Sequence, residues 1–273
     1  MDTGALYPVA SLTYLGLAFM FWRAYWGGEG THRHGFNYRL AILAPLALHT
    51  WLLYIDVFSA PTLRFGFGQA LSVTLWLAVA IYWIENFFVR LDGLQFFVLT
   101  LAGVCVVLPG LFIGFTTQAH GDSFVFRLHL VLAMGAYSLF TIASLQALLM
   151  SILEKRLHTG ALTGAFATLP PLLSLERVLF RIIGIAFILL TATLATGFVF
   201  SEQVFFRAMR FDHKTIFAIT SWVIFAGLLI GRLIYGWRGR TAIRWILAGF
   251  VALLLAYVGS RFVLEVILRR GGG

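Results

Sequence analysis

Histidines are the residues of this chain best suited to chemistry, and four of them lie inside apolar runs or close to their ends, at His49, His120, His129 and His213. The other three lie in polar stretches, and we assign them no role. Polar groups are costly inside hydrocarbon, so an ionisable side chain in an apolar run indicates a function. A neutral imidazole offers one nitrogen lone pair to a metal ion. His49, His129 and His213 are therefore candidate metal ligands.

Two of these histidines also have an ordinary structural interpretation. His49, in the middle of an apolar run, can be hydrogen-bonded across helices to a serine, a threonine or a backbone carbonyl. His213 lies between Asp212 and Lys214 and can be an interfacial residue. Alternatively, the adjacent carboxylate can orient its imidazole and raise its basicity. The sequence leaves both interpretations open.

His129 stands near the start of an apolar segment that carries a polar stripe. Tyr137, Thr141 and Ser144 recur at spacings of four and three, so they share one face of a helix. Polar groups repeated on one face of an apolar helix face protein rather than lipid. We therefore expect this helix to lie within the bundle and His129 to have a functional role.

Aromatic side chains make up 16% of the chain, and composition alone favours an ordinary aromatic belt at the membrane interface over a haem cleft. Several are expected on the same face as His129 and His213, namely Phe124, Phe126, Phe205, Phe206, Phe211 and Trp222. A flat haem needs an aromatic cleft and an imidazole ligand, although membrane interfaces also collect aromatic residues. Cys105 is the only cysteine, which excludes covalent c-type attachment.

The few charged residues argue against several classes of protein. Only Asp56, Glu85 and Glu265 come near an apolar run, each close to its end, which disfavours a pump or channel for hard cations. The net charge of +9 comes largely from basic residues at the ends of apolar runs, so it indicates membrane topology and no nucleic-acid binding. The sequence contains no phosphate-binding loop, zinc-protease helix or nucleophile elbow.

Transmembrane helices are the elements that must position these residues. Hydrophobic residues make up 60% of the 273 residues, charged residues 11%, and the mean hydropathy is +0.92. Apolar runs of about 18 to 25 residues cross a hydrocarbon core of roughly 30 Å. The sequence predicts an all-α integral membrane protein, a bundle of eight transmembrane helices in a single membrane domain over 1–273. The expected helices are about 5–22, 38–58, 66–86, 93–110, 125–153, 176–200, 214–235 and 241–268.

Basic loops set the expected orientation. The connections after the first, fifth and seventh helices are densely basic, and such loops stay in the cytoplasm. Both chain ends then face outward, as do His129 and His213. The first apolar run lacks a basic start and a small-residue cleavage site, so we expect a retained helix. Ser174, after the pair Pro170 and Pro171, is expected to cap the sixth helix.

Three stretches in the C-terminal half carry a family resemblance. They are Leu128-His129 with Met134 to Ser138, then Pro170 to Phe198, and then His213 to Trp245, which includes GWRGR at 236–240. The match continues through Tyr257 and Arg261. The sequence resembles the cytochrome c assembly family, the haem-handling membrane proteins that include CcsA and CcmC, and most closely its smaller YpjD branch. The resemblance is strongest over 125–268.

The resemblance implies a protein of the bacterial inner membrane that binds or handles haem at the periplasmic face, together with cytochrome c maturation components. His129 matches the external histidine beside the family's haem platform. Asp212, Lys214 and Trp222 fall where larger members carry the end of their WWD motif, but the preceding tryptophans are absent, and a family histidine is replaced at about Ile230. We therefore expect a binding protein rather than an enzyme. It would hold b-type haem non-covalently through His129, with His213 or His49 as the second ligand.

Two other classes remain as alternatives. One is a non-haem membrane subunit for divalent metal homeostasis, of the Mg or Co type, in which the histidines bind the metal or carry protons. The other is a membrane scaffold whose helices serve only for contacts with partners and lipid. A haem absorption band separates both from the haem-binding hypothesis.

Overall fold

The structure is a computed structural model that describes residues 3–26, 36–58, 63–89, 91, 93–112, 116–117, 124–158, 172–205, 213–263 and 267. Each of the eight expected ranges contains a described helix. The longer helices are α1 (Leu6–Trp26), α2 (Phe36–Leu53), α3 (Phe67–Glu85), α4 (Gln95–Cys105), α6 (Phe124–His158), α7 (Leu172–Phe205), α8 (His213–Tyr235) and α9 (Gly239–Leu254).

Short elements fill the remainder of the described chain. They are the 3-10 turn η1 (Thr3–Ala5), the π-helical turns η2 (Tyr54–Phe58) and η4 (Leu255–Gly259), the helices α5 (Leu108–Leu111) and α10 (Ser260–Phe262), and the strands β1 (Leu63–Arg64) and β2 (Thr116–Thr117). The strands pair antiparallel, with Leu63 opposite Thr117. The all-helical fold class is confirmed for the described residues, apart from this one short pairing.

Two helix boundaries differ from the sequence prediction. The expected helix 93–110 is interrupted between Cys105 and Leu108, because Pro109 has no N–H to donate to the preceding turn. Helix α7 begins at Leu172, so Ser174 lies inside the helix and the prediction that it caps the helix is wrong. Leu172 packs against the main core, which favours this earlier start.

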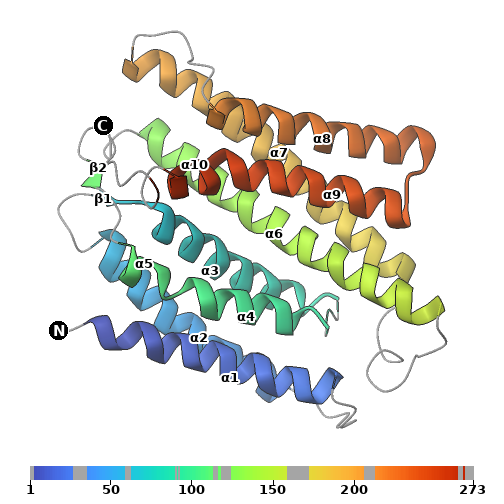
Figure 1. The fold of residues 1–273 in the computed structure, drawn as a ribbon, viewed down its shortest axis with the longest axis horizontal. Coiled ribbons are helices and arrows are strands. Elements are labelled where there is room, and N and C mark those ends of the chain that lie inside the picture. The colour runs from blue at the N-terminus through green and yellow to red at the C-terminus, as the bar shows by residue number, and fades with distance from the viewer. Residues whose placement is uncertain are drawn as a thin grey trace.

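The helices form two groups that meet at α6 (Figure 1). Helices α1 to α4 make up one group and α6 to α9 the other, and α6 contacts α3 on one side and α7 and α9 on the other. We call the end of the bundle where α6 begins the Phe124 end and the opposite end the His158 end. Helices α3 and α8 also begin at the Phe124 end, and α7 ends there (Figure 1).

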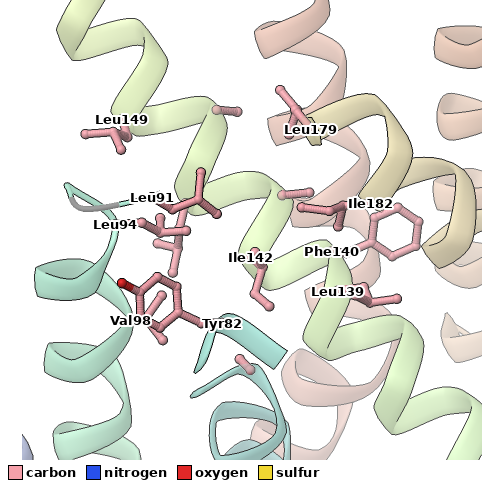
Figure 2. Packing of buried hydrophobic residues seen from close by; sticks show 14 of the residues in the cluster. Tyr82, Leu91, Leu94, Val98, Leu139, Phe140, Ile142, Leu149, Leu179 and Ile182 are labelled. Atoms are coloured by element: carbon pink, nitrogen blue, oxygen red, sulfur yellow. The ribbon is translucent and has the colours of Figure 1, made fainter. Parts of the chain in front are cut away.

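A buried apolar core joins the two groups through α6. Figure 2 shows members of this core from α3, α4, α6, α7 and the α3–α4 turn: Tyr82, Leu91, Leu94, Val98, Leu139, Phe140, Ile142, Leu149, Leu179 and Ile182. Helix α6 supplies core residues toward both groups. It is therefore enclosed by protein along its middle, as the polar stripe predicted.

Ion pairs at the His158 end hold α6, α7, α8 and α9 together. The buried Glu176 accepts a hydrogen bond from Nη1 of Arg232 at 2.6 Å and lies 3.8 Å from Nε of Arg238. Glu154, at the end of α6, lies 3.4 Å from Nε of Arg240. The connection between α8 and α9 is thus tied to both neighbouring helices.

Five stretches of the described chain are long and apolar enough to cross a bilayer. They are Phe67–Glu85, Phe124–Arg156, Leu172–Phe198, His213–Tyr235 and Gly239–Phe262. A hydrocarbon core of roughly 30 Å requires about 20 residues of α-helix, which each of these stretches approaches or exceeds. The chain is therefore a helical integral membrane protein.

Candidate functional site

His129 is half-buried in the second turn of α6 and lies against the outer part of α7. Its Nδ1 is 3.1 Å from the carbonyl oxygen of Thr193 and 3.1 Å from the hydroxyl oxygen of Thr196. Gly197 lies beside the ring, where an added Cβ would be in ordinary van der Waals contact with Cε1 of the imidazole, at 3.4 Å. Both partners of the ring come from one turn of a neighbouring helix, so α7 fixes where the imidazole points.

The hydrogen bonds assign the proton of this imidazole. The carbonyl of Thr193 can only accept a hydrogen bond. The hydroxyl of Thr196 lies 2.9 Å from the carbonyl of Ala192 and donates along its own helix, so it also acts as an acceptor toward the ring. Nδ1 of His129 is therefore the protonated nitrogen of the neutral ring.

The second nitrogen of the ring is left with an open lone pair. Among the described residues, no hydrogen-bond partner is found for Nε2 of His129, and this is the nitrogen that a neutral, Nδ1-protonated imidazole offers to a metal. A ring held through Nδ1 by a backbone carbonyl is the usual arrangement for a histidine that ligates through Nε2.

The buried core of the α6–α9 group stops before the Phe124 end. Within the described residues, the outermost buried positions on these helices are Ala133, Leu190, Ser221 and Ala256. His129 lies one turn beyond Ala133, among side chains that are partly or fully exposed. In the other group the same end is closed, because every residue from Phe65 to Ala70 at the start of α3 is buried. The described side chains around His129 are therefore partly or fully exposed rather than enclosed in the core.

His213 is the first residue of α8 and is exposed at the Phe124 end. The structure thus places it at the same end of the bundle as His129, as the sequence predicted. Asp212, the carboxylate expected to orient it, lies outside the described residues, as does His120.

Trp222 lies about 13 Å along α8 from His213, nine residues further on. Its indole Nε1 donates to the hydroxyl of Thr191 at 2.9 Å, and its ring stacks on Phe187 with centroids 5.4 Å apart. At 100° per residue, this contact and the His129 contact lie roughly 150° apart around α7. The structure therefore does not bring Trp222 and His129 together.

His49 lies in the other helix group and is fully buried. Its Nε2 is 2.8 Å from the hydroxyl of Ser72 on α3, and its Nδ1 is 3.3 Å from the hydroxyl of Tyr14 on α1. Both ring nitrogens of His49 are thus engaged by side chains of neighbouring helices. This is the cross-helix arrangement that the sequence left open as its alternative.

The polar stripe on α6 serves packing rather than the His129 contact. The hydroxyl of Tyr137 donates to the carbonyl of Leu253 at 2.7 Å. The hydroxyl of the neighbouring Ser138 lies 2.7 Å from the carbonyl of Met134 in its own helix and 3.0 Å from the carbonyl of Thr74 on α3. The stripe lies about 90° around the helix from His129. These bonds join α6 to α9 and α3.

Sequence reasoning missed the partners of His129 on α7. Thr193, Thr196 and Gly197 belong to the run TATLATGF, in which small and hydroxyl residues recur within an apolar helix. Such residues allow helices to approach closely. That signal could have pointed to a contact here, although it does not name the partner. Among the described residues, no three His, Cys, Asp or Glu side chains form a metal-binding group.

Comparison with known proteins decides the family. The model of the family described as Cytochrome C assembly protein matches residues 38–268, which is most of the chain. The chain belongs to this family. The match begins in α2 and continues past α10, so it covers both groups of helices and all three candidate histidines.

Individual members of the cytochrome c assembly family match shorter segments. Inner membrane protein YpjD of Escherichia coli strain K12 is 38% identical over 140 residues, which cover 51% of this chain and 52% of that protein. The cytochrome c biogenesis protein CcsA of Synechocystis is 31% identical over 109 residues, 40% of this chain and 33% of that protein. The CcsA of Nostoc is 33% identical over 106 residues, 37% of this chain and 30% of that protein.

These matches set the extent of the similarity. The chain spans about half the length of the YpjD protein that it matches and about a third of the length of the CcsA proteins. No solved structure matches it. With a relative of the inner membrane, a family of membrane assembly proteins and five apolar helices of sufficient length, the chain is a multi-pass protein of the bacterial inner membrane.

Proposed function

We propose that this protein binds b-type haem non-covalently at the Phe124 end, with Nε2 of His129 as an axial ligand. The proposal is supported by the different surroundings of the two ring nitrogens. Nδ1 is hydrogen-bonded to α7, whereas Nε2 has no hydrogen-bond partner among the described residues. A resting histidine in a packed helix pair would ordinarily satisfy both nitrogens, as His49 does.

The residues at the Phe124 end fit a haem group in three respects. The donor is a neutral imidazole nitrogen, the ligand type that haem iron prefers. Among the described residues beyond Ala133 and Leu190 on α6 and α7, the side chains are partly or fully exposed, which suits a ligand that approaches from outside the bundle. His213, exposed at the same end, is the candidate for a second axial ligand. Bound haem supplies an iron centre that changes its oxidation state, and the protein's part is to hold and orient it.

We propose eight membrane crossings, with both chain ends and the Phe124 end on the periplasmic side. Support comes from the charges at the His158 end, where Arg177, Arg181, Arg238, Arg240 and Arg244 are exposed. An excess of Lys and Arg in short loops and near the ends of membrane helices marks the cytoplasmic side. A periplasmic haem site then lies on the side where c-type cytochromes mature.

The proposed role is haem handling during cytochrome c maturation, by binding and presentation rather than catalysis. Family membership supports it, as does similarity to proteins named for cytochrome c biogenesis. Maturation components would be the partners, because a protein that only presents haem needs a recipient.

The absorption and pyridine haemochrome spectra of detergent-purified protein test this proposal. We expect a Soret band in the wild type that His129→Ala removes, that His213→Ala shifts or weakens, and that His49→Ala leaves in place in the folded fraction. A colourless wild type after haem is supplied would contradict the proposal. If the colourless protein bound cobalt or zinc stoichiometrically, the divalent-metal alternative would replace it.

A further inference from the structure

We propose that Thr196 is a positioning residue that selects which nitrogen of His129 is available to a metal. The inference rests on the proposed haem function for its consequence, but the selection itself is a property of the protein without haem. Among the described residues, the Thr196 hydroxyl makes one hydrogen-bonding contact outside α7, with Nδ1 of His129 at 3.1 Å.

The three threonines on this part of α7 make the same contact with their own helix. Thr191 donates to Phe187 at 2.8 Å, Thr193 to Leu189 at 2.8 Å, and Thr196 to Ala192 at 2.9 Å. A hydroxyl has one proton, so each of these oxygens is left with acceptor capacity only. The bond within α7 therefore accounts for the proton of each hydroxyl. The three threonines differ in the group outside α7 that each hydroxyl oxygen faces.

Thr196 is the threonine whose hydroxyl faces His129. Thr193 approaches the same Nδ1 with its backbone carbonyl, at 3.1 Å, while its hydroxyl is turned to Leu189. Thr191 instead accepts a hydrogen bond from the indole of Trp222. Two acceptors therefore surround Nδ1. The Thr196 hydroxyl also lies 3.0 Å from the carbonyl of Thr193, so a substitution of the Thr196 side chain removes one acceptor and leaves that carbonyl beside Nδ1 without its contact to the hydroxyl.

Two acceptors at one nitrogen favour one tautomer. A neutral imidazole carries a single ring proton, and only its location on Nδ1 satisfies both oxygens. With the proton on Nε2, the lone pair of Nδ1 would face the lone pairs of a carbonyl and a hydroxyl. The contact thus keeps Nε2 unprotonated in the protein without metal, with its lone pair available. It also increases the basicity of the ligand, as hydrogen bonds to the distal nitrogen of metal-bound histidines do.

The test compares two threonine variants, of which only Thr196→Val removes an acceptor at Nδ1. Thr196→Val removes the hydroxyl acceptor, whereas Thr193→Val, the matched control, removes a hydroxyl of the same helix but retains the carbonyl beside Nδ1. Both lose a hydroxyl that donates within α7, so both report equally on a merely structural role. Thr196→Ser restores an acceptor and serves as the conservative rescue.

The first readout is the tautomer of His129 in the protein without haem, measured by nitrogen-15 NMR of histidine-labelled protein in detergent and assigned with His129→Gln. We expect Nδ1–H in the wild type, Thr193→Val and Thr196→Ser. In Thr196→Val we expect the Nδ1–H to Nε2–H ratio to fall about fivefold, as the loss of a hydrogen bond of ordinary net strength implies.

The second readout is haem affinity, which we expect to fall about tenfold in Thr196→Val, given the usual effect of removing such a supporting bond. We expect a smaller fall in Thr193→Val, which keeps both acceptors at Nδ1. Equal tautomer ratios in Thr196→Val and Thr193→Val, or Nε2–H in the wild type, would overturn the role of Thr196. If the wild type bound no haem, the proposed function would fail, whereas the tautomer measurement would still decide the positioning role.

Discussion

The phenyl rings of Phe140 and Phe225 stack with their centroids 3.9 Å apart and join α6 to α8 through the middle of the second helix group. Both side chains are fully buried. Phe225→Ala leaves a cavity between the two helices, and we expect a loss of stability of about 3 kcal/mol. Phe225→Leu, which keeps most of the volume, should lose less than half of that. Thermal unfolding in detergent measures both, and equal losses would mean that the stack does not fill this space.

The buried carboxylate of Glu176 is the centre of the ion pairs at the His158 end. Glu176→Gln removes the charge that Arg232 contacts at 2.6 Å, and the side chain of Arg232 is only 21% exposed. We expect a destabilisation of about 2 kcal/mol, the order of a charge-assisted hydrogen bond in a largely buried position.

Glu154→Gln is the matched control for Glu176→Gln. Glu154 pairs with Arg240, whose side chain is 69% exposed, so its loss should cost about 0.5 kcal/mol or less. Increasing salt should weaken the Glu154 pair and leave the effect of Glu176→Gln largely unchanged, because buried pairs are poorly screened. A larger effect at Glu154 would show that burial does not set the order of the two pairs.

Gly231 on α8 supports the indole of Trp237, which lies against it after the turn. A Cβ at Gly231 would overlap that ring, which is held on its other side by Trp245 with centroids 5.0 Å apart. We expect Gly231→Ala to destabilise the protein by about 2 kcal/mol through overpacking. At Gly184 nothing lies within 4 Å of the added atom, so Gly184→Ala should be neutral or stabilising by up to about 1 kcal/mol. Equal unfolding temperatures for the two variants would contradict this.

His49 and His129 should give opposite results in the same pair of assays. His49→Leu removes the partner of both Ser72 and Tyr14 and should cost about 2 kcal/mol of stability while haem binding persists. His129→Leu should abolish haem binding with little change in stability, because its ring is half-buried. If folded His49→Leu lost the haem band, our proposal would have placed the ligand in the wrong helix group.

Helix positions and fold class could be read from the sequence because bilayer thickness imposes run length and because polar groups are costly in hydrocarbon. The stripe of Tyr137, Thr141 and Ser144 correctly indicated a face packed on protein. The interruption at Pro109 was also readable from the missing N–H, although it was not predicted. The family resemblance was confirmed by the match over 38–268.

Pairings between helices could not be read from the sequence, because they depend on how each helix is rotated. No pattern in the chain states that His129 meets Thr193 and Thr196, or that His49 meets Ser72 and Tyr14. The segment GWRGR stood out as specific, and the structure gives the reason. Gly236 and Gly239 have φ angles of 66° and 54°, which favour glycine, and Arg238 and Arg240 reach the carboxylates of α7 and α6.

Helix α6 has 35 residues and is therefore about 52 Å long, roughly 20 Å more than the hydrocarbon layer is thick. Even a steep tilt of about 40° leaves close to 10 Å outside that layer. If this excess is shared between its ends, His129, about 7 Å from the first residue of α6, stands at the depth of the lipid headgroups. A large amphiphilic ligand can then reach the imidazole from the membrane boundary, with its polar edge in water, without entering the hydrocarbon.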